Sequence, residues 1–251
     1  MSANELNGKV AIVTGAGRNI GRAIALALAA DGASILINAR SNRAEADGVA
    51  REIEAAGGKA IAHIGDVGDA ARVQAMVELA VKHFGRIDIL VNNAALRREK
   101  PFAEMTYAEW REIMSVTLDG TFHCVKACLP HLKKSGAGTI VNIGGLSAHT
   151  GAKDRAHVVT AKAGIIGFTR ALAHDLASDG ITVNCVVPGL IGTPRPKHKP
   201  EPAHHLTHQT ITGERGRPED VAAAVRFLCG PGARYVNGQA IHTNGGAYLG
   251  G

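Results

Sequence analysis

The chain has 251 residues, of which 45% are hydrophobic, 20% charged and 4% aromatic, and its formal net charge is +6. The apolar fraction excludes a disordered chain, and the length suits one large domain with a core of its own. No apolar run reaches the roughly 18 residues that a transmembrane helix needs. The polar stretch 1–8 lacks the basic and apolar pattern of a secretory signal, so a cytoplasmic location is expected.

The basic residues and the cysteines bear on the binding partners and on the redox compartment of the protein. Lys and Arg are scattered along the chain without interleaved aromatic residues, which argues against nucleic acid as a partner. The four cysteines include no CxxC pair, so free buried thiols in a reducing compartment are expected.

Short apolar segments alternate with longer helical patterns along the whole chain. The first strand is expected over Lys9–Thr14, and an alanine-rich helix follows it and ends at Ala30. Further strands are expected over Ser34–Ala39, Lys59–Ile64, Ile87–Asn92, Thr139–Ile143, Ile181–Val187 and Gln239–Thr243. The other helices are expected over Arg43–Ala56, Asp69–Phe84, Thr106–Leu118, Thr121–Lys134, Val159–Ser178 and Pro218–Leu228. This pattern is typical of a parallel sheet with helices on both faces, so we expect a single α/β domain of about seven strands over residues 1–251.

A glycine-rich segment joins the first strand to the first helix. It contains Gly15, Gly17 and Gly21, with Arg18, Asn19 and Ile20 before the last glycine. Glycines at this place let the backbone approach a pyrophosphate, whose charge is stabilised by the helix N-terminus. The segment therefore predicts a dinucleotide-binding turn, and the alternative is a tight structural turn.

Several motifs, in order and spacing, resemble the typical short-chain dehydrogenase/reductase family. The glycine loop, the NNAA segment that begins at Asn92, the PG…T segment that begins at Pro188 and the stretch 236–246 carry the resemblance, which extends from Lys9 to Gly246. It implies a single-domain, doubly wound Rossmann fold that assembles as a homotetramer. It also implies cofactor contacts from Gly15, Gly17, Arg18, Asn19, Ile20, Gly21, Asp66, Val67, Asn92, Ala94, Lys162, Pro188, Gly189, Ile191 and Thr193.

The end of the second strand bears on the choice of cofactor. NAD-binding Rossmann proteins usually place an acidic residue there, bonded to the ribose hydroxyls. Residues 38–43 contain no carboxylate, whereas Arg40, followed by Ser41, and Arg18 could face a 2′-phosphate. We therefore expect NADP(H), whose phosphates also account for part of the positive charge. NAD stays the alternative, in which both arginines are solvated.

The chemical centre departs from the family pattern. The family uses Asn, Ser, Tyr and Lys: the tyrosine, its pKa lowered by the lysine ammonium, exchanges a proton with the substrate oxygen. In this chain Lys162 is retained, but Val158, Gly145 and Thr117 stand where Tyr, Ser and Asn are expected. Valine has no proton to donate, so the usual mechanism cannot operate.

Other side chains could supply the proton. Ser147, His149 and His157 lie near the altered positions, and histidines titrate close to neutral pH. The alternative for each of these three residues is a solvated or hydrogen-bonded side chain without a role in catalysis. Water is a further source.

Residues 194–212 correspond to the substrate lid of the family. His204 and His208 are four residues apart, as in zinc-binding pairs, but no HExxH glutamate accompanies them, and a substrate-facing or solvated cluster is favoured over a metal. No metal is expected. The same segment contains further histidines and cations that suit an anionic substrate or form a solvated rim: His198, His205, Arg195, Lys197 and Lys199.

Two function classes remain open. In the first, the protein is an NADP(H)-dependent oxidoreductase that acts on a carbonyl, an alcohol or an activated C=C bond of a small molecule. In the second, it is a nucleotide-binding pseudoenzyme or a non-redox protein on the same scaffold. A lyase or dehalogenase would require the loss of the nicotinamide pocket, against which Pro188, Gly189 and Thr193 argue. The apolar positions Val159, Ala163, Ile166 and Ala173 serve either a subunit interface or the internal core.

Overall fold

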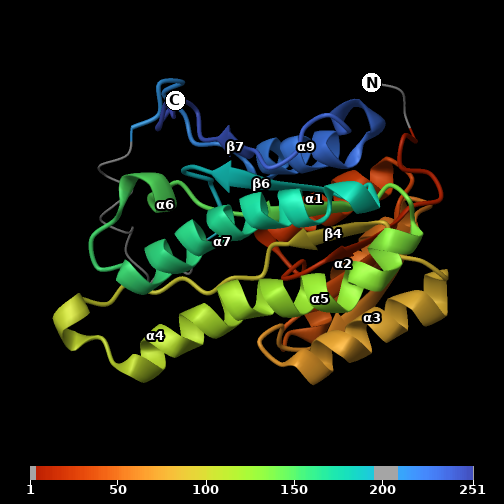
Figure 1. Ribbon diagram of the computed structural model, residues 1–251, viewed down its shortest axis with the longest axis horizontal. Coiled ribbons are helices and arrows are strands. Elements are labelled where there is room, and N and C mark those ends of the chain that lie inside the picture. The colour runs from red at the N-terminus through yellow and green to blue at the C-terminus, as the bar shows by residue number, and fades with distance from the viewer. Residues whose placement is uncertain (1–3, 195–208, 251) are drawn as a thin grey trace.

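The computed structural model describes residues 4–194 and 209–250. Seven parallel strands form one sheet in the order β3-β2-β1-β4-β5-β6-β7 (Figure 1). Their bounds are β1 Val10–Val13, β2 Ser34–Ala39, β3 Lys59–Ile64, β4 Ile89–Asn92, β5 Thr139–Ile143, β6 Thr182–Pro188 and β7 Ala240–Thr243. The strand order reverses between β1 and β4, and in such sheets a crevice opens at the carboxyl ends of the strands beside this reversal. The expected single α/β domain with a doubly wound sheet is confirmed.

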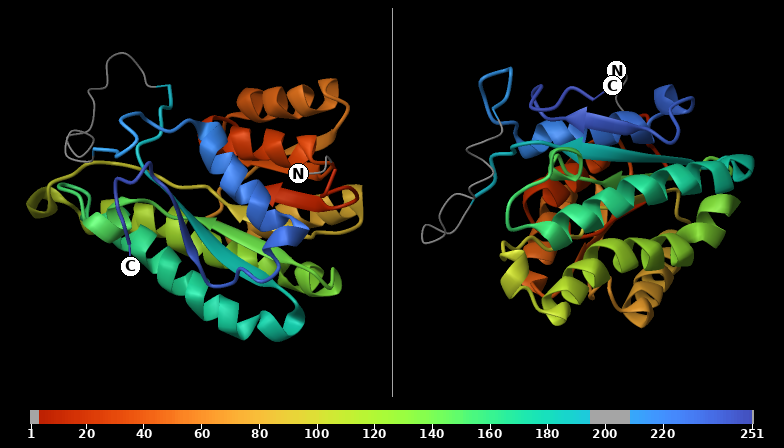
Figure 2. Two further views of the ribbon diagram at one scale, coloured as in Figure 1. Left: turned by 90° about the horizontal axis from the view of Figure 1, so that it is seen from above. Right: turned by 60° about the vertical axis from the view of Figure 1, so that its left-hand side comes forward.

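Helices cover both faces of the sheet (Figure 2). One face carries α1 Asn19–Ala30, α2 Arg43–Ala55 and α9 Pro218–Cys229. The other carries α3 Ala70–Phe84, α5 Gly120–Lys134 and α7 Ala156–Asp175. Because both faces are covered, every residue of β1, β4, β5 and β6 is buried, which explains why these strands are mostly apolar in the sequence.

The helical region after β4 differs from the expected single helix over Thr106–Leu118. A capping box formed by Thr106 and Glu109 starts α4, Tyr107–Met114, and a π-helix over Ser115–Asp119 then leads directly into α5. Within the π-helix the backbone N–H of Gly120 donates to the carbonyl of Ser115, five residues earlier. The chain therefore forms one long, locally widened helical segment rather than two separate helices.

Two further differences concern the region after β5. A four-residue helix, α6 Ser147–Thr150, was not expected from the sequence. In addition, α7 begins at Ala156 rather than at Val159, because the N–H of Val159 already donates to the carbonyl of Arg155 at 2.8 Å. His157 and Val158 consequently lie in the first turn of α7. Short 3₁₀ turns occur at residues 102–104, 177–179 and 231–233.

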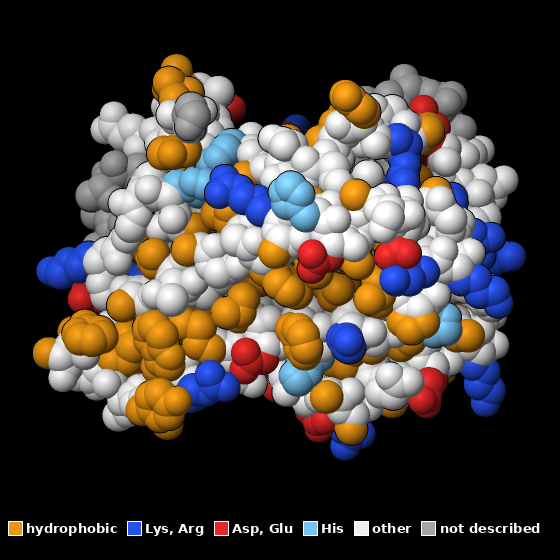
Figure 3. Space-filling model, in the orientation of Figure 1, with side chains coloured by type: hydrophobic (Ala, Val, Ile, Leu, Met, Phe, Trp, Pro, Cys, Tyr) orange, Lys and Arg blue, Asp and Glu red, His pale blue; other side chains and the backbone are white. Residues whose placement is uncertain are grey.

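The surface of the helical layer made by α4, α5 and α7 is rich in apolar side chains (Figure 3). Of the four apolar positions proposed for an interface, Ile166 and Ala173 are buried in the protein's own core, Val159 is half-buried and Ala163 is exposed. Phe122 of α5 is 52% exposed. None of the helices in the described ranges is long and apolar enough to cross a membrane.

Candidate active site

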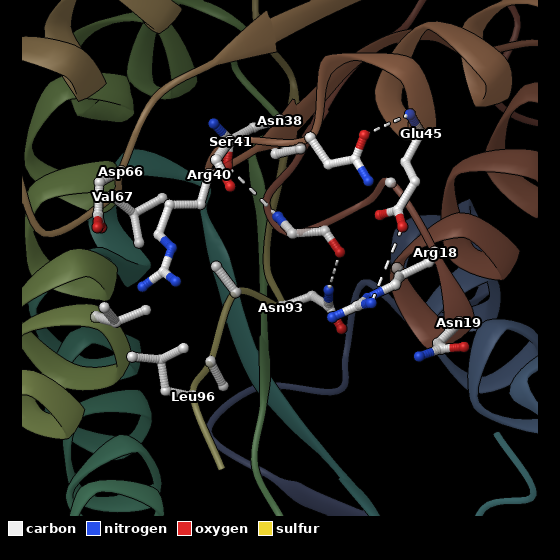
Figure 4. Close-up of a pocket in the computed structure, with 18 of the residues that line it drawn as sticks. Arg18, Asn19, Asn38, Arg40, Ser41, Glu45, Asp66, Val67, Asn93 and Leu96 are labelled. Carbon is white, nitrogen blue, oxygen red and sulfur yellow. Dashed lines mark hydrogen bonds and ion pairs between the residues drawn. The ribbon is translucent and has the colours of Figure 1, made fainter. Parts of the chain in front are cut away.

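A cavity of about 610 Å³ opens at the carboxyl ends of β1, β2 and β4 (Figure 4). Twelve of the predicted cofactor residues line it: Gly15, Gly17, Arg18, Asn19, Ile20, Gly21, Arg40, Ser41, Asp66, Val67, Ala94 and Thr193. The remaining lining residues were not predicted as cofactor contacts; they are Asn38, Ala39, Asn42, Glu45, Gly65, Asn93, Ala95, Leu96, Arg97 and Val116. The predicted residues therefore come together from five separate loops.

The glycine loop is held against the segment that follows β4. The hydroxyl of Thr14 accepts hydrogen bonds from the backbone N–H groups of Asn93 and Ala94, both at 3.0 Å, and the Asn93 amide donates to the carbonyls of Thr14 and Gly15. Gly15 has φ +62°, and a methyl group on it would lie 2.9 Å from the Cα of Ala94. A side chain at Gly21 would collide with the carbonyl of Gly15. Both glycines are thus required by close backbone approach.

The N-terminus of α1 faces this loop without a side-chain cap. Arg18 occupies the capping position, and its side chain forms no hydrogen bond to the first turn of the helix. The first backbone N–H groups of a helix have no partner within the helix, and together with the helix dipole they form an anion site. The loop and the helix start can therefore hold a phosphate group.

Arg40 lines the cavity on the side of Val67, and Arg18 and Glu45 line the other side (Figure 4). Arg18 pairs with Glu45 at 3.9 Å, whereas Arg40 forms no ion pair with any residue of the described ranges. Glu45 belongs to the first turn of α2, where its N–H donates to the capping side chain of Asn42 at 3.2 Å. The sequence analysis found no carboxylate at the end of β2; one nevertheless reaches the cavity from the following helix.

Five of the predicted cofactor residues do not line the cavity. Asn92 donates from its amide to Oδ1 of Asn142 at 2.9 Å, inside the sheet. Pro188 ends β6, the N–H of Gly189 donates to the carbonyl of Thr243 at 3.0 Å, and Ile191 pairs with Gly216. A further predicted residue outside the cavity lining, Lys162, belongs to α7 and is described next.

Lys162 is 6% exposed and lies between α7 and the end of β5. Its ammonium donates a hydrogen bond to the carbonyl of Ile143, the last residue of β5. Burial and, to a smaller extent, the positive charge of Arg97 lower the pKa of Lys162 to about 7, and Cys185 acts in the opposite direction. Because Arg97 lines the cavity, the electrostatics of Lys162 are coupled to the cavity wall.

Neither Val158 nor Gly145, the residues expected from the sequence at the Tyr and Ser positions, carries a hydroxyl. Val158, one turn earlier on α7, is 3% exposed and packs against Ile113 and Met114 of α4. Gly145 lies on the other side: a Cβ placed on it would contact only Cγ of Lys162, at 3.7 Å. The neighbouring Gly144 has no such space, since a Cβ there would lie 2.8 Å from the sulfur of Cys185.

Thr117 lies in the π-helix and is 2% exposed. Its hydroxyl has no hydrogen-bond partner in the part of the chain that the structure describes, although its carbonyl accepts from the Thr121 hydroxyl at 2.8 Å. The π-turn thus presents a buried hydroxyl at the position where the family pattern predicts a carboxamide.

The three alternative proton donors lie in different surroundings. Ser147 begins α6 and is half-buried. His149 contacts His242 of β7 and Tyr248, with ring centroids 4.6 and 5.1 Å apart, and burial and Arg170 lower its pKa. His157 is fully buried, both its ring nitrogens lack hydrogen-bond partners among the described residues, and burial lowers its pKa.

No group of three or more metal-binding side chains occurs within residues 4–194 and 209–250. The histidines and cations of the expected lid, from Arg195 to His208, lie outside the described residues.

Comparison with known proteins gives a consistent result. The family model described as enoyl-(acyl carrier protein) reductase matches residues 15–248. A 3-oxoacyl-[acyl-carrier-protein] reductase, FabG, from Staphylococcus aureus is 38% identical over 242 residues, which cover 96% of this chain and 98% of that protein. The crystal structure of a dehydrogenase/reductase from Sinorhizobium meliloti has a TM-score of 0.92 and 35% identity, covering 97% of this chain and 96% of that chain.

A second solved structure is a short-chain dehydrogenase from Burkholderia cenocepacia in complex with NADP. It is 36% identical with a TM-score of 0.90, and the match covers 97% of this chain and 99% of that chain. Since the family match and these similarities extend over nearly the whole length, the chain belongs to the short-chain dehydrogenase/reductase family.

Proposed function

We propose that the protein is an NADP(H)-dependent oxidoreductase that acts on a carbonyl, an alcohol or an activated C=C bond of a small molecule. The observation that carries this proposal is the cavity at the carboxyl ends of β1, β2 and β4, which is lined by an uncapped helix N-terminus and by Arg40. When bound, NADPH supplies the hydride.

The residues present fit this cofactor. Gly15 and Gly21 let the glycine loop pack tightly against the segment after β4 and against the start of α1. This close packing keeps the loop at the helix N-terminus, where it would bind the pyrophosphate. Arg40, with help from Arg18, would hold the 2′-phosphate, since a guanidinium forms paired hydrogen bonds with phosphate oxygens. Asp66 would bind the adenine and Lys162 the nicotinamide ribose, as the family resemblance implies. The Burkholderia cenocepacia relative, whose crystal structure is a complex with NADP, supports the same choice.

The altered chemical centre restricts the reaction. We propose that Val158, Gly145 and Thr117 occupy the positions of the family's Tyr, Ser and Asn. The Staphylococcus aureus relative is named for the reduction of a 3-oxoacyl group on acyl carrier protein. General acid catalysis contributes about 10²–10⁴-fold, so unless another group supplies the proton this chain is expected to reduce ordinary ketones and 3-oxoacyl thioesters poorly.

A nucleotide-binding pseudoenzyme is the second candidate. It is favoured by one observation, namely that neither position 145 nor position 158 carries a hydroxyl while the cofactor segments are kept.

One experiment separates the two candidates. The purified protein is titrated with NADPH and NADH, and a panel of ketones, aldehydes, thioesters and enones is then screened through the absorbance of reduced nicotinamide. We expect NADPH to bind more tightly than NADH and at least one panel member to be turned over. Tight NADPH binding without turnover of any substrate would favour the pseudoenzyme, and failure to bind either cofactor would refute both candidates.

A further inference from the structure

We propose that Lys162 itself donates the proton to the substrate oxygen, so that the reaction needs no acidic side chain at position 158. This inference rests on the proposed oxidoreductase function and assigns the proton source for that site.

The position of the ammonium group is the first support. Lys162 reaches the carboxyl end of β5, which is the edge of a parallel sheet where ligands bind. An ammonium group has three N–H donors, and the carbonyl of Ile143 is the one hydrogen-bond partner that the described residues provide. Two N–H groups are therefore left for groups that enter the site.

The space beside Lys162 is the second support. On the side of Gly145, an added methyl group would meet nothing within 4 Å except Cγ of Lys162, at 3.7 Å. The next residue back, Gly144, is closed by Cys185. Of these two neighbouring glycines, only Gly145 has open space beside it, and there the family pattern has a hydroxyl that touches the substrate oxygen. This space adjoins the side chain of Lys162 at Cγ, and the proposal places the substrate oxygen there.

The apolar wall opposite is the third support. Val158 packs into a small cluster with Ile113, Met114 and Ala161, and this cluster contains no proton donor. No carboxylate pairs with Lys162 within residues 4–194 and 209–250. Burial and the charge of Arg97 lower the pKa of Lys162 to about 7, and the opposing effect of Cys185 is smaller. At neutral pH both the acid and its conjugate base are populated, as efficient general acid catalysis requires.

The alternative donors have weaker support. The ring of His149 packs against those of His242 and Tyr248, and the charge that acts on it is that of Arg170. The charges that act on His157 are those of Arg155, Glu109 and Arg98, on the side of α4, and its side chain is fully buried. Lys162 is not among the groups that shift the pKa of either histidine.

The proton transfer balances in both directions. In reduction, the substrate carbon gains the hydride and its oxygen takes a proton from the Lys162 ammonium; one N–H bond breaks, one O–H bond forms, and a neutral amine remains. Water then returns a proton to the amine. In oxidation the neutral amine accepts the proton of the alcohol.

The first test measures the titration of Lys162 in the cofactor-free protein. Lysine labelled with ¹³C at Cε is incorporated, and the Lys162 resonance is assigned by its loss in Lys162→Arg. Lys153→Arg, which changes an exposed lysine on the connection to α7, serves as the matched control for the substitution. We expect a titration midpoint near 7, in line with the burial of this side chain. A midpoint near the ordinary value of 10.5 would overturn the proposal.

The second test separates binding from proton transfer. Arginine keeps a positive charge for the ribose hydroxyls but holds its proton at neutral pH. In Lys162→Arg we expect NADPH affinity to stay within about threefold and turnover to fall by about 100-fold or more, while Lys153→Arg changes neither. Wild-type turnover in Lys162→Arg would overturn this inference alone. A midpoint near 7 without turnover of any substrate would instead overturn the oxidoreductase function, and the inference with it.

Discussion

Replacing Arg40 by alanine is expected to weaken NADPH binding by about 10–100-fold and to leave NADH binding unchanged. The two cofactors differ only in the 2′-phosphate, which we assign to Arg40. A hydrogen bond to a charged group contributes about 1.5–3 kcal/mol, and each 1.4 kcal/mol corresponds to a factor of ten. The variant Arg40→Asp, which restores a carboxylate at the end of β2, is expected to reverse the preference.

Whether Arg40, Arg18 and Glu45 form ion pairs determines how much each substitution is expected to change the affinity for NADPH. Arg40 pairs with no carboxylate in the described part of the chain, so it binds a phosphate without giving up a partner. Arg18 is already paired with Glu45 at 3.9 Å, and its side chain is 74% exposed. An exposed pair of this kind is worth about 0.2–1 kcal/mol. Arg18→Ala is therefore expected to cost less than Arg40→Ala, and Glu45→Gln is expected to strengthen NADPH binding by up to about fivefold.

The assay is calorimetric titration of each variant with NADPH and NADH at one low salt concentration, because salt screens exposed charges. Arg43→Ala is the matched control: this arginine starts α2 three residues beyond Arg40, pairs with Asp47 at 3.7 Å and does not line the cavity. Equal affinity of the wild-type protein for the two cofactors would refute the assignment. If Arg40→Ala weakened the binding of NADPH and NADH equally, this side chain would act on the adenosine part that the two cofactors share.

Three further predictions concern catalysis, pH and assembly. The double variant Gly145→Ser, Val158→Tyr is expected to raise the turnover of simple ketones at least tenfold, which is within the usual size of general acid catalysis. The single variant Gly145→Ser is the control. A folded double variant without any gain in turnover would count against the assigned positions. Because burial lowers the pKa of Lys162 to about 7, the unfolded chain binds more protons than the folded one between 7 and 10.5, so stability due to this group rises with pH in that window. Lys162→Met is therefore expected to melt above the wild type at about pH 6, and a thermal melt at about pH 10 should show this advantage reduced; a constant difference would contradict the burial argument. Light scattering of the wild-type protein is expected to show a homotetramer. The variant Phe122→Asp, which places a charge on an exposed apolar residue of α5, is expected to show a smaller species. A monomeric wild type at micromolar concentration would rule out the assembly.

Several strands could be predicted residue by residue. The bounds of β2, β3 and β5 agree with the expected ranges because each is a short apolar run with loop residues on both sides. The connection between α4 and α5 could not be predicted, since the apolar period that marks a helix does not reveal the one extra residue of a π-turn. The start of α7 was placed too late because polar residues precede it, yet Arg155 provides a carbonyl that extends the helix.

The cofactor end of the site was largely predictable, because its residues follow strand ends at the carboxyl edge of a parallel sheet. Glu45 was missed because it lies in a helix, where sequence alone does not show which side chains face a cavity; the Asn42 cap three residues earlier was a usable signal. Arg97 was missed because its influence on Lys162 comes through space, between residues 65 positions apart in the sequence.

The π-helix over Ser115–Asp119 affects how this segment tolerates changes of length. In a regular helix an added residue turns everything beyond it by about 100°, whereas a π-turn absorbs that residue locally. Ile113 and Met114 on one side and Cys124 and Val125 on the other can therefore keep their buried orientations when a single residue is gained or lost here. During divergence this is a place where the length of the chain can vary without repacking the core, and Thr117 is the side chain whose placement such a change would alter.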